Sequence, residues 1–540
     1  MGNIVTKDKF IGGGGPLVQV LDAAELENDK PQQVQVKGPD GATTSLLLVK
    51  HSTPSPAGGS PKKSSANGEV ITALGSKCPH YGAPLVNGHF EGGRIRCPWH
   101  GACFSTQTGD IEDFPAIDSI PCVQLRQEKG KIVMPAEQLK LFQSRTRELL
   151  TKEVRKQRAH ATEGHGNVVI IGSGGAGQAC ADELVRGGFR GRIRVVTSDA
   201  ALPYDRPKLS KNPAAEFEQL ALREEDYYKA AHVEVILGTS VTSVDSSAKT
   251  VCLKRNGSDE TEEIMYQTLV IAPGASPVKL PLPGIESTDS VLTIRSLADA
   301  GRIAAHIKEG ARLVVLGGSF VALELAAFAR GKGAAVTVVM RGQVPFETSL
   351  GPEIGAKIKA LHEVNGVVFE TGTSFQVIYA HDDSREFKEV LLTNGKIVEG
   401  DVCVLGVGAT PATEFLKETH SNWLDEKGFI PVDKNLRVNG TSKEDEVFAC
   451  GDATTFPYRT GFVGGSRVNI SHWQVAQNMG RAVGKAILAA EAKKEEDQTP
   501  FTVAPFFWTV HYGKSIRFSA MVHHQCLSLS GMPAGMGSES

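Results

Sequence analysis

The chain has 540 residues, a formal net charge of −3 and nine cysteines. This length exceeds one hydrophobic core, since domains average roughly 150 residues, and about three or four domains are expected. The near-balanced charge argues against a nucleic-acid partner, and an odd number of scattered cysteines argues against a secreted disulfide framework. No apolar run reaches the roughly 18 residues that cross a bilayer, so a cytoplasmic protein is expected.

Residues 1–15 are predicted to form a flexible N-terminus. They begin MGNIVT, which fits an N-myristoylation signal with Gly2 as the acceptor, although a plain flexible leader fits equally well. One acyl chain gives only marginal membrane binding, so the motif predicts at most attachment to a membrane surface. Asp8 and Asp22 disfavour a mitochondrial transit peptide. A mitochondrial location is therefore the alternative to the cytoplasmic one.

Residues 16–136 hold short strand-like runs broken by turn residues, which predict a small all-β domain. The stretch 52–68 is rich in Pro, Gly, Ser and Lys and is expected to be a long loop. A polar segment with helical spacing follows this domain, so residues 137–165 are expected to form a helical linker.

Two short motifs in the β-rich domain carry metal-binding side chains. Cys78 and His80 form C-x-H, and sixteen residues later Cys97 and His100 form C-x-x-H. Zinc sites of the mixed type usually group two cysteines at one end and two histidines at the other. One cysteine and one histidine in each half suit a Rieske 2Fe-2S centre, in which two thiolates hold one iron and two imidazoles hold the other. Structural zinc is the alternative.

The sequences around these ligands, CPHYGAPL and CPWHGACF, are similar to the two Rieske ligand loops. Respiratory Rieske loops carry one extra cysteine each, and Ala83 and Trp99 stand at those positions here. The resemblance is therefore to the ferredoxin and oxygenase branch. Cys103 has no partner in the first loop and is expected to be a buried structural thiol.

From Asn167 onward strands and helices alternate, with two strand–turn–helix units about 145 residues apart. In the first unit Gly172, Gly174 and Gly177 form G-x-G-x-x-G directly after VVII. Glycines at these positions permit a tight turn, close approach to a pyrophosphate and helix packing, and the helix N-terminus favours negative charge. Asp199, two residues later than usual after the next strand, is the candidate for binding a ribose.

The second unit departs from this pattern. Gly317 begins its turn, but Ser319 replaces the second glycine and Ala322 replaces the third. After the next strand, Met340 stands where an acid would bind the ribose, and Arg341 follows. Loss of the acid and gain of a cation are compatible with a 2′-phosphate and hence with NADPH. Weakened nucleotide binding is an equal alternative.

Three further segments stand in the order found in flavin-dependent pyridine-nucleotide reductases. They are PYDRPKLSK (203–211), LVIAPGASP (269–277) and EVFACGDA (446–453). With the two metal loops in front, residues 16–519 closely resemble the Rieske-bearing branch of the apoptosis-inducing-factor-like proteins. The disulfide reductases place two close cysteines after the first nucleotide turn, whereas Cys180 stands alone there.

The resemblance implies roles for individual residues. The three glycines of the first turn would hold the pyrophosphate of FAD, with Arg206 and Lys211 near the flavin and its phosphates. Asp452 would bind the ribityl chain, and Trp473 would lie beside the isoalloxazine. Glu324 would face the flavin and the nicotinamide and pair with Lys211, which makes these two the expected catalytic residues. The second turn would bind NADH or NADPH.

The expected fold is multidomain, with a small all-β Rieske domain followed by an α/β flavoprotein reductase containing two Rossmann-like domains. The resemblance implies an FAD-binding domain in two parts (166–295 and 426–500), with an NAD(P)-binding domain between them (296–425). Family members continue beyond this point into a further α/β region. Residues 501–540 are therefore expected to be a truncated C-terminal region with a disordered tail.

These features predict an FAD-dependent NAD(P)H oxidoreductase that passes electrons from reduced flavin to the Rieske cluster and then to an unknown acceptor. A flavin takes two electrons as a hydride and can release them singly, as a 2Fe-2S centre requires. The alternative is a pro-apoptotic signalling protein whose redox sites control conformation or partner binding. A reductase that feeds a separate oxygenase is a third hypothesis.

Overall fold

The computed structural model describes residues 16–51, 70–162, 166–442, 445–458, 467–492, 501–503 and 505–519. The expected leader with Gly2, the expected loop at 52–68 and the expected tail lie outside these residues. Within the described ranges, no helix has both the length and the apolar character needed to span a membrane.

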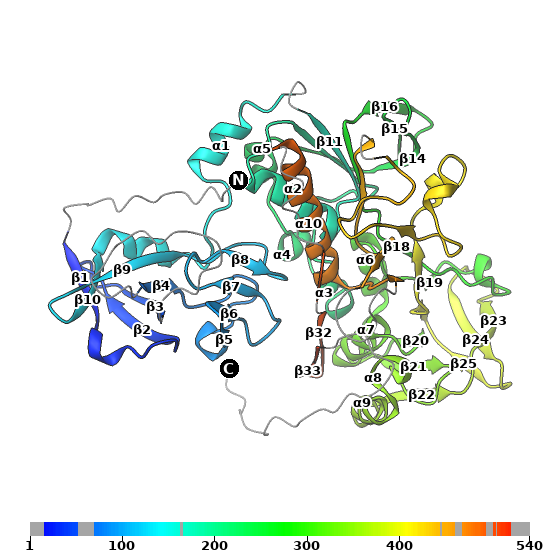
Figure 1. Ribbon diagram of the computed structural model, residues 1–540. Coiled ribbons are helices and arrows are strands. Elements are labelled where there is room, and N and C mark those ends of the chain that lie inside the picture. The colour runs from blue at the N-terminus through cyan, green and yellow to red at the C-terminus, as the bar shows by residue number, and fades with distance from the viewer. Residues whose placement is uncertain are drawn as a thin grey trace.

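The N-terminal region contains two antiparallel sheets, drawn in blue and cyan in Figure 1. The larger has the strand order β1-β10-β9-β4-β3-β2, and the smaller, β5-β6-β7-β8, is inserted between β4 and β9. The strands are β1 (Leu17–Asp22), β2 (Gln32–Lys37), β3 (Thr43–His51), β4 (Val70–Gly75), β5 (His89–Glu91), β6 (Arg94–Arg96), β7 (Cys103–Ser105), β8 (Ile111–Asp113), β9 (Cys122–Glu128) and β10 (Lys131–Pro135). In β2, Val34 and Val36 are buried while Gln33 and Gln35 are exposed, the period-two alternation of a strand with one covered face.

The segment after β10 contains two short helices. A 3-10 helix spans Ala136–Gln143, and helix α1 spans Lys152–Arg158. Helix α1 begins where the Thr151 hydroxyl accepts a hydrogen bond from the Val154 amide at 3.3 Å, the N-cap that threonine commonly supplies.

The first α/β unit is built on a five-stranded parallel sheet with the order β13-β12-β11-β17-β29. Its central strand is fully buried, as expected for an apolar run covered on both faces. The strands are β11 (Asn167–Ile171), β12 (Arg192–Val196), β13 (Val233–Ile236), β17 (Thr268–Ile271) and β29 (Val447–Ala449), and the helices are α2 (Gly175–Arg186), α3 (Pro207–Lys211), α4 (Phe217–Leu220), α5 (Glu225–Ala231) and α10 (Trp473–Glu491). Helices α2 and α10 pack against each other beside this sheet (Figure 1).

The second α/β unit lies in the chain between β17 and β29 and repeats the parallel arrangement in the order β19-β26-β20-β21-β22. Its strands are β19 (Val291–Leu292), β20 (Arg312–Leu316), β21 (Ala335–Met340), β22 (Val367–Thr371) and β26 (Val402–Leu405), and its helices are α6 (Leu297–His306), α7 (Phe320–Gly331), α8 (Glu347–Leu350) and α9 (Pro352–Val364). Each unit has its own apolar core.

Smaller sheets complete the two α/β units. Two are three-stranded and antiparallel, β14-β15-β16 and β23-β24-β25, and a third, β28-β30-β31, is mixed. Strands β18 and β27 form a two-stranded link between the units. Their bounds are β14 (Thr239–Asp245), β15 (Thr250–Arg255), β16 (Thr261–Met265), β18 (Ala275–Pro277), β23 (Phe375–Ala380), β24 (Phe387–Leu392), β25 (Ile397–Glu399), β27 (Ala409–Pro411), β28 (Ile430–Pro431), β30 (Thr454–Pro457) and β31 (Arg467–Val468).

The last described element is a hairpin of β32 (Phe506–His511) and β33 (Lys514–Ser519). Figure 1 shows it between the N-terminal β-rich region and α7. Its residues contact the metal loops on one side and α7 on the other. The hairpin therefore joins regions that are far apart in the chain.

Candidate active site

Two of the three glycines in the first turn, Gly172 and Gly177, leave no room for a side chain. A Cβ on Gly172 would lie 2.1 Å from the Ala272 carbonyl oxygen, and one on Gly177 would lie 1.9 Å from that of Gly172. Gly174 is the N-cap of α2 and supplies no side-chain hydrogen bond to the first turn of the helix. The helix N-terminus therefore keeps its amides for an anion, and the turn fits a pyrophosphate.

A cavity of about 380 Å³ opens beside this turn. It brings together residues that the sequence analysis selected for three different roles. The predicted residues that line it are His80, His100, Gly174, Arg206, Lys211, Ser319, Glu324, Asp452 and Trp473. The predicted residues that do not line it are Cys78, Cys97, Gly172, Gly177, Asp199, Gly317 and Ala322.

Glu324 stands at the polar centre of the cavity wall with 4% of its surface exposed. Its Oε1 lies 2.9 Å from Nζ of Lys211, so the expected pairing of these two residues is confirmed. The hydroxyl of Ser210 donates to Oε2 at 2.5 Å, and that of Thr509 donates to Oε1 at 2.6 Å. A buried carboxylate needs such partners, because an unpaired charge in the interior is costly.

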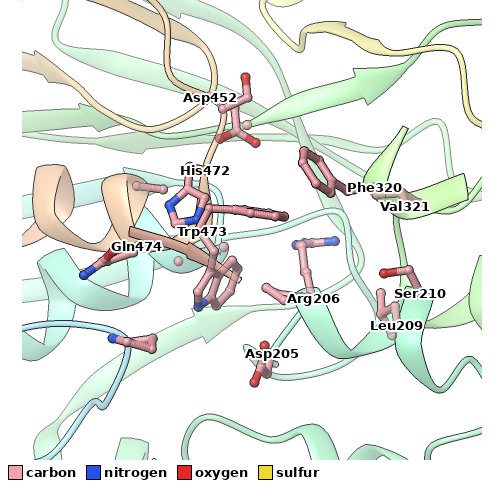
Figure 2. A pocket seen from close by; sticks show the side chains of 18 of the residues that line it. Asp205, Arg206, Leu209, Ser210, Phe320, Val321, Asp452, His472, Trp473 and Gln474 are labelled. Atoms are coloured by element: carbon pink, nitrogen blue, oxygen red, sulfur yellow. The ribbon is translucent and has the colours of Figure 1, made fainter. Parts of the chain in front are cut away.

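His472 is the N-cap of α10 and Trp473 is its first residue, and both project into the cavity together with Arg206 and Asp452 (Figure 2). Burial lowers the pKa of His472 to about 4, and the positive charge of Lys211 adds to this effect. The six-membered ring of the Trp473 indole lies 3.2 Å from the place where a Cβ on Gly175 would stand. His472 and Trp473 therefore form an aromatic, uncharged part of the wall beside the first turn.

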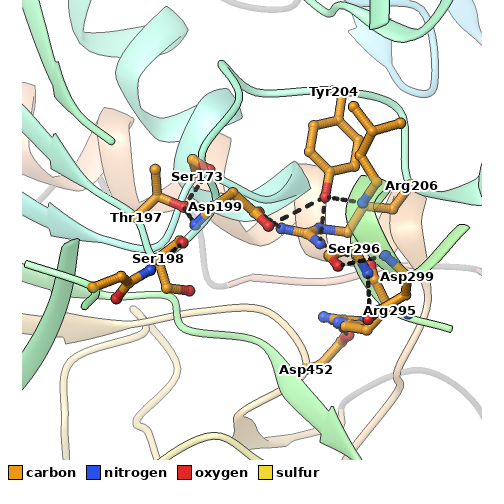
Figure 3. Close-up of polar contacts among 12 residues, drawn as sticks. Ser173, Thr197, Ser198, Asp199, Tyr204, Arg206, Arg295, Ser296, Asp299 and Asp452 are labelled. Carbon is orange, nitrogen blue, oxygen red and sulfur yellow. Dashed lines mark hydrogen bonds and ion pairs between the residues drawn. The ribbon is translucent and has the colours of Figure 1, made fainter. Parts of the chain in front are cut away.

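Asp199 forms an ion pair with Arg206, and Tyr204 donates a hydrogen bond to it at 3.3 Å (Figure 3). Arg206 also donates to the backbone oxygen of Arg295 at 2.9 Å. Asp199 thus lies behind the cavity wall and holds a cation that lines it.

Sequence reasoning missed Arg295, which lines the cavity and forms an ion pair with Asp452 at 3.4 Å. Burial lowers the pKa of Arg295 in spite of Asp452. A signal for its fixed position was present, because Arg295 directly precedes a capping box formed by Ser296 and Asp299 at the start of α6.

The four predicted metal ligands form two pairs. The Cys78 and Cys97 thiols hydrogen-bond to each other, which raises the pKa of Cys78 and lowers that of Cys97. Nδ1 of His80 lies 3.0 Å from Nδ1 of His100. Burial lowers the pKa of His80 to about 3 and that of His100 to about 4, so both rings are neutral, as metal ligands must be.

This donor set fits a 2Fe-2S cluster better than zinc. A structural zinc ion needs four ligands around one point, and nowhere in the described ranges do three or more His, Cys, Asp or Glu side chains converge in that way. Two thiols side by side and two imidazoles side by side match a cluster that distributes its ligands over two irons. Cys103, expected to be a buried structural thiol, is buried.

The histidine side of the metal loops faces the cavity. The Tyr81 ring stacks on that of His80 with 3.8 Å between centroids, and its hydroxyl donates to Asp205 at 3.3 Å. The Trp508 ring of the hairpin lies 4.0 Å from that of His100, centroid to centroid. Tyr81 and Asp205 are single residues in loops and Trp508 is a single residue of β32, so none of them belongs to a pattern from which it could have been selected.

The second turn is arranged differently. Ser319 is the N-cap of α7, and its hydroxyl accepts a hydrogen bond from the Ala322 amide at 3.3 Å. A Cβ on Gly318 would lie 3.3 Å from the Met340 sulfur, which packs over the turn. Met340 is buried, whereas Arg341 is exposed.

Comparison with known proteins matches two families to two parts of the chain. The Rieske [2Fe-2S] domain family matches residues 17–124, and the pyridine nucleotide-disulphide oxidoreductase family matches residues 166–480. Apoptosis-inducing factor 3 from Homo sapiens is 40% identical over 500 residues, covering 93% of this chain and 75% of the relative. The ferredoxin–NAD(+) reductase subunit of the benzene 1,2-dioxygenase system of Pseudomonas putida is 30% identical over 347 residues, covering 64% of this chain and 78% of that protein.

A solved structure supports the fold of the α/β part. The covalent putidaredoxin reductase–putidaredoxin complex matches with a TM-score of 0.58 and 27% identity, over 66% of this chain and 81% of that one. The expected fold class, a Rieske domain followed by a flavoprotein reductase, is confirmed.

Proposed function

The chain belongs to the pyridine nucleotide-disulphide oxidoreductase family and carries a Rieske domain, and from this premise we propose that it relays electrons from NAD(P)H to the cluster within one molecule. It is an FAD-dependent NAD(P)H oxidoreductase. When bound, FAD supplies hydride chemistry in two-electron units, and the 2Fe-2S cluster supplies one-electron chemistry. The final acceptor would be a separate one-electron carrier.

One observation carries the proposal. His80 and His100 line the same cavity as Gly174 and Asp452, so the imidazole side of the metal loops and the first nucleotide turn share one cavity. In a protein that served a separate ferredoxin, this side of the flavin site would be open to solvent. The shared cavity therefore favours electron transfer from flavin to cluster within the chain over the hypothesis that the redox sites only control conformation or partner binding.

Contacts outside the cavity hold the β-rich region in this position. The buried Arg223 side chain lies 2.7 Å from Asp118 of that region and 2.9 Å from Asp182 of α2. On the other side, Asp113 accepts hydrogen bonds from Gln474 at 3.2 Å and from Asn478 at 2.8 Å. A buried ion pair between two regions is directional, so it favours one docked orientation.

The residue roles follow from these positions. Cys78, Cys97, His80 and His100 would hold the cluster, and the first glycine turn would hold the FAD pyrophosphate. Asp452 would bind the ribityl chain. Asp199 would bind a ribose after giving up its ion pair with Arg206, and Arg206 and Trp473 would lie beside the isoalloxazine. Lys211 and Glu324 would be the catalytic residues. The second turn would bind NAD(P)H through Gly317, Ser319 and Ala322.

The test uses the full chain loaded with FAD and iron, without oxygen. NADH or NADPH is mixed in, flavin absorbance is followed by stopped flow, and cluster reduction is followed by EPR. Cluster reduction should come after flavin bleaching at a rate that does not change with protein concentration, because the transfer is intramolecular. A rate that rises with concentration, or a cluster that stays oxidised, would contradict the relay.

A matched pair of variants tests the docking. Arg223→Gln removes the ion pairs with both Asp118 and Asp182 and should slow cluster reduction while flavin bleaching keeps its rate. Arg385→Gln removes the exposed ion pair with Asp289, which lies 3.0 Å away, and should change neither step. The same experiment with both donors decides between NADH and NADPH.

Attachment to a membrane surface through Gly2 is a further part of the proposal, with a cytoplasmic location and mitochondria as the alternative. It rests on the MGNIVT motif. Labelling of the expressed chain with a myristate analogue, with Gly2→Ala as the control, is expected to show label on the wild type alone.

A further inference from the structure

Polar side chains continue behind Glu324, away from the cavity. The Thr509 hydroxyl is bonded to Oε1 of Glu324 at 2.6 Å and lies 3.1 Å from Nε2 of His511. Thr509 and His511 are fully buried, and neither lines the cavity. Two hydrogen bonds joined end to end thus lead from the cavity wall into the protein interior.

The line of polar groups continues from His511 to the molecular surface. The His511 and His362 rings are 5.0 Å apart between centroids, and Nδ1 of His362 lies 3.0 Å from the Tyr512 hydroxyl. His362 is fully buried, whereas Tyr512 is partly exposed and lies in the turn of the hairpin beside the exposed Gly513.

Packing alone does not account for these side chains. Residues two apart on a strand share a face, so Thr509 and His511 both point from β32 toward α7, while Val510 between them is exposed. Apolar residues would fill the same space. Instead, Nε2 of His362 is buried without a hydrogen-bond partner among the described residues, an arrangement that costs stability.

The reaction supplies a reason for such a line. Oxidation of one NAD(P)H yields two electrons and one proton, and one-electron acceptors take only the electrons. The proton must then leave a cavity whose carboxylate is buried. This reasoning rests on the proposed function.

We propose that Glu324, Thr509, His511, His362 and Tyr512 form a path that carries this proton from the cavity to solvent. When Glu324 takes up a proton, the Thr509 hydroxyl turns from Oε1 of Glu324 to Nε2 of His511. The Glu324 proton then moves to Oγ1 of Thr509 as the hydroxyl proton of Thr509 moves to Nε2 of His511. The His511 and His362 rings, 5.0 Å apart between centroids, must move together for the next transfer, since no hydrogen bond joins them at rest. His511 then passes its Nδ1 proton to Nε2 of His362, and His362 passes its Nδ1 proton to Tyr512, whose own proton goes to water. Only bonds to hydrogen form and break.

The surroundings keep the two imidazoles neutral, so that each can accept a proton at one nitrogen and donate at the other. Burial lowers the pKa of His362 to about 3, and neighbouring His511 lowers it further. Burial and Lys211 lower the pKa of His511, while the charge of Glu324 and a hydrogen bond to the Leu323 backbone oppose them. Arg330 is the charged group that faces Tyr512.

The main test compares Thr509→Val with Thr509→Ser in the loaded full chain. Proton release into a weakly buffered solution is followed with an indicator dye, alongside cluster reduction. The valine variant should release protons about 100-fold more slowly, as expected for loss of a positioned proton carrier. The serine variant should restore release, and added imidazole buffer should rescue the valine variant. Thr373→Val is the control, since it removes another buried hydroxyl, bonded to Thr393 at 3.0 Å.

A second measurement does not depend on turnover. In the apoprotein, nitrogen NMR of the histidine rings should show Nε2 of His511 shifting in Thr509→Val and in Glu324→Gln, but not in Thr373→Val. If Thr509→Val does not fold, His362→Phe interrupts the path further out and should slow release to a similar extent.

The outcomes separate the two proposals. If the wild type fails to reduce its cluster, the relay is wrong. The NMR result then tests the hydrogen bonds from Glu324 through Thr509 to His511 independently of the relay. If the relay works and Thr509→Val releases protons at the wild-type rate, or if imidazole gives no rescue, the path is wrong and the relay stands.

Discussion

The two nucleotide turns of this chain have the same position between strand and helix but use the helix N-terminus differently. In the first, Gly174 caps α2 without a side chain, and the amides remain for an anion. In the second, the Ser319 hydroxyl already occupies the Ala322 amide of α7. Because the first turn has no capping side chain, all its helix N-terminal amides can bind a pyrophosphate. In the second turn, the serine side chain already accepts a hydrogen bond from one of these amides.

The third motif position also has no side chain in the first turn and has one in the second. Gly177 packs so closely on Gly172 that no Cβ fits, whereas Ala322 carries a Cβ and is buried. The first turn is thus tighter and more open to a phosphate. This difference suits a cofactor that stays bound at the first turn and a dinucleotide that exchanges at the second.

The largest effect is expected from Gly177→Ala. The new Cβ would meet the Gly172 carbonyl at 1.9 Å, so the helix must move away from the strand. Overpacking of this kind should lower the free energy of unfolding by about 3 kcal/mol. Ala322→Gly, the equivalent exchange in reverse, should cost about 1 kcal/mol through helix propensity alone. Urea unfolding followed by circular dichroism measures both, and equal losses would remove the distinction between the turns.

Gly174→Ser would give the first turn the cap of the second. Space is available, since a Cβ there has only Nε of Arg206 within reach, at 3.9 Å. The new hydroxyl should compete with the phosphate for an amide and weaken FAD binding by about 2 kcal/mol, the worth of a hydrogen bond to a charged group, or roughly thirtyfold. Flavin titration of the apoprotein tests this, and an unchanged dissociation constant would contradict it.

Acid should destabilise the second unit through His362, which is fully buried in α9. The pKa of His362 is about 3 when folded. The unfolded value is about 6.5, so between these values the unfolded chain binds more protons. The free energy of unfolding is therefore not reduced by His362 above pH 6.5. Between pH 6.5 and pH 3 it falls by at most about 1.4 kcal/mol per pH unit. His362→Phe should flatten the dependence of unfolding free energy on pH, while the exposed His381→Gln should leave it unchanged.

The smallest effect is expected at Ser319. Ser319→Ala removes the cap of α7 and should cost about 1 kcal/mol, whereas Ser319→Gly should cost only a few tenths. The glycine variant also frees the Ala322 amide, so it should bind NAD(P)H more tightly than the wild type. Fluorescence titration measures the binding, and weaker binding by Ser319→Gly would show that the serine itself contacts the dinucleotide.

Local spacing was enough for the parts of the site that a short segment encodes. The C-x-H and C-x-x-H motifs gave four side chains that the fold brings into two pairs, and the glycine spacing located both turns. The pairing of Lys211 with Glu324 came from resemblance, since nothing in either segment requires the other. Asp199 shows the limit, because a strand end predicts an acid near a ribose and cannot reveal that Arg206 already holds it.

By itself, the sequence determined the domain types, the candidate metal ligands and the difference between the two turns. All of these depend on residues that are neighbours in the chain, or on backbone geometry that only glycine permits. The tertiary structure alone decided that His80 and His100 line the cavity beside the first turn, that Arg295 meets Asp452, and that the hairpin at 506–519 places Thr509 and His511 behind Glu324. Such contacts join segments up to several hundred residues apart, and packing of whole sheets and helices sets them.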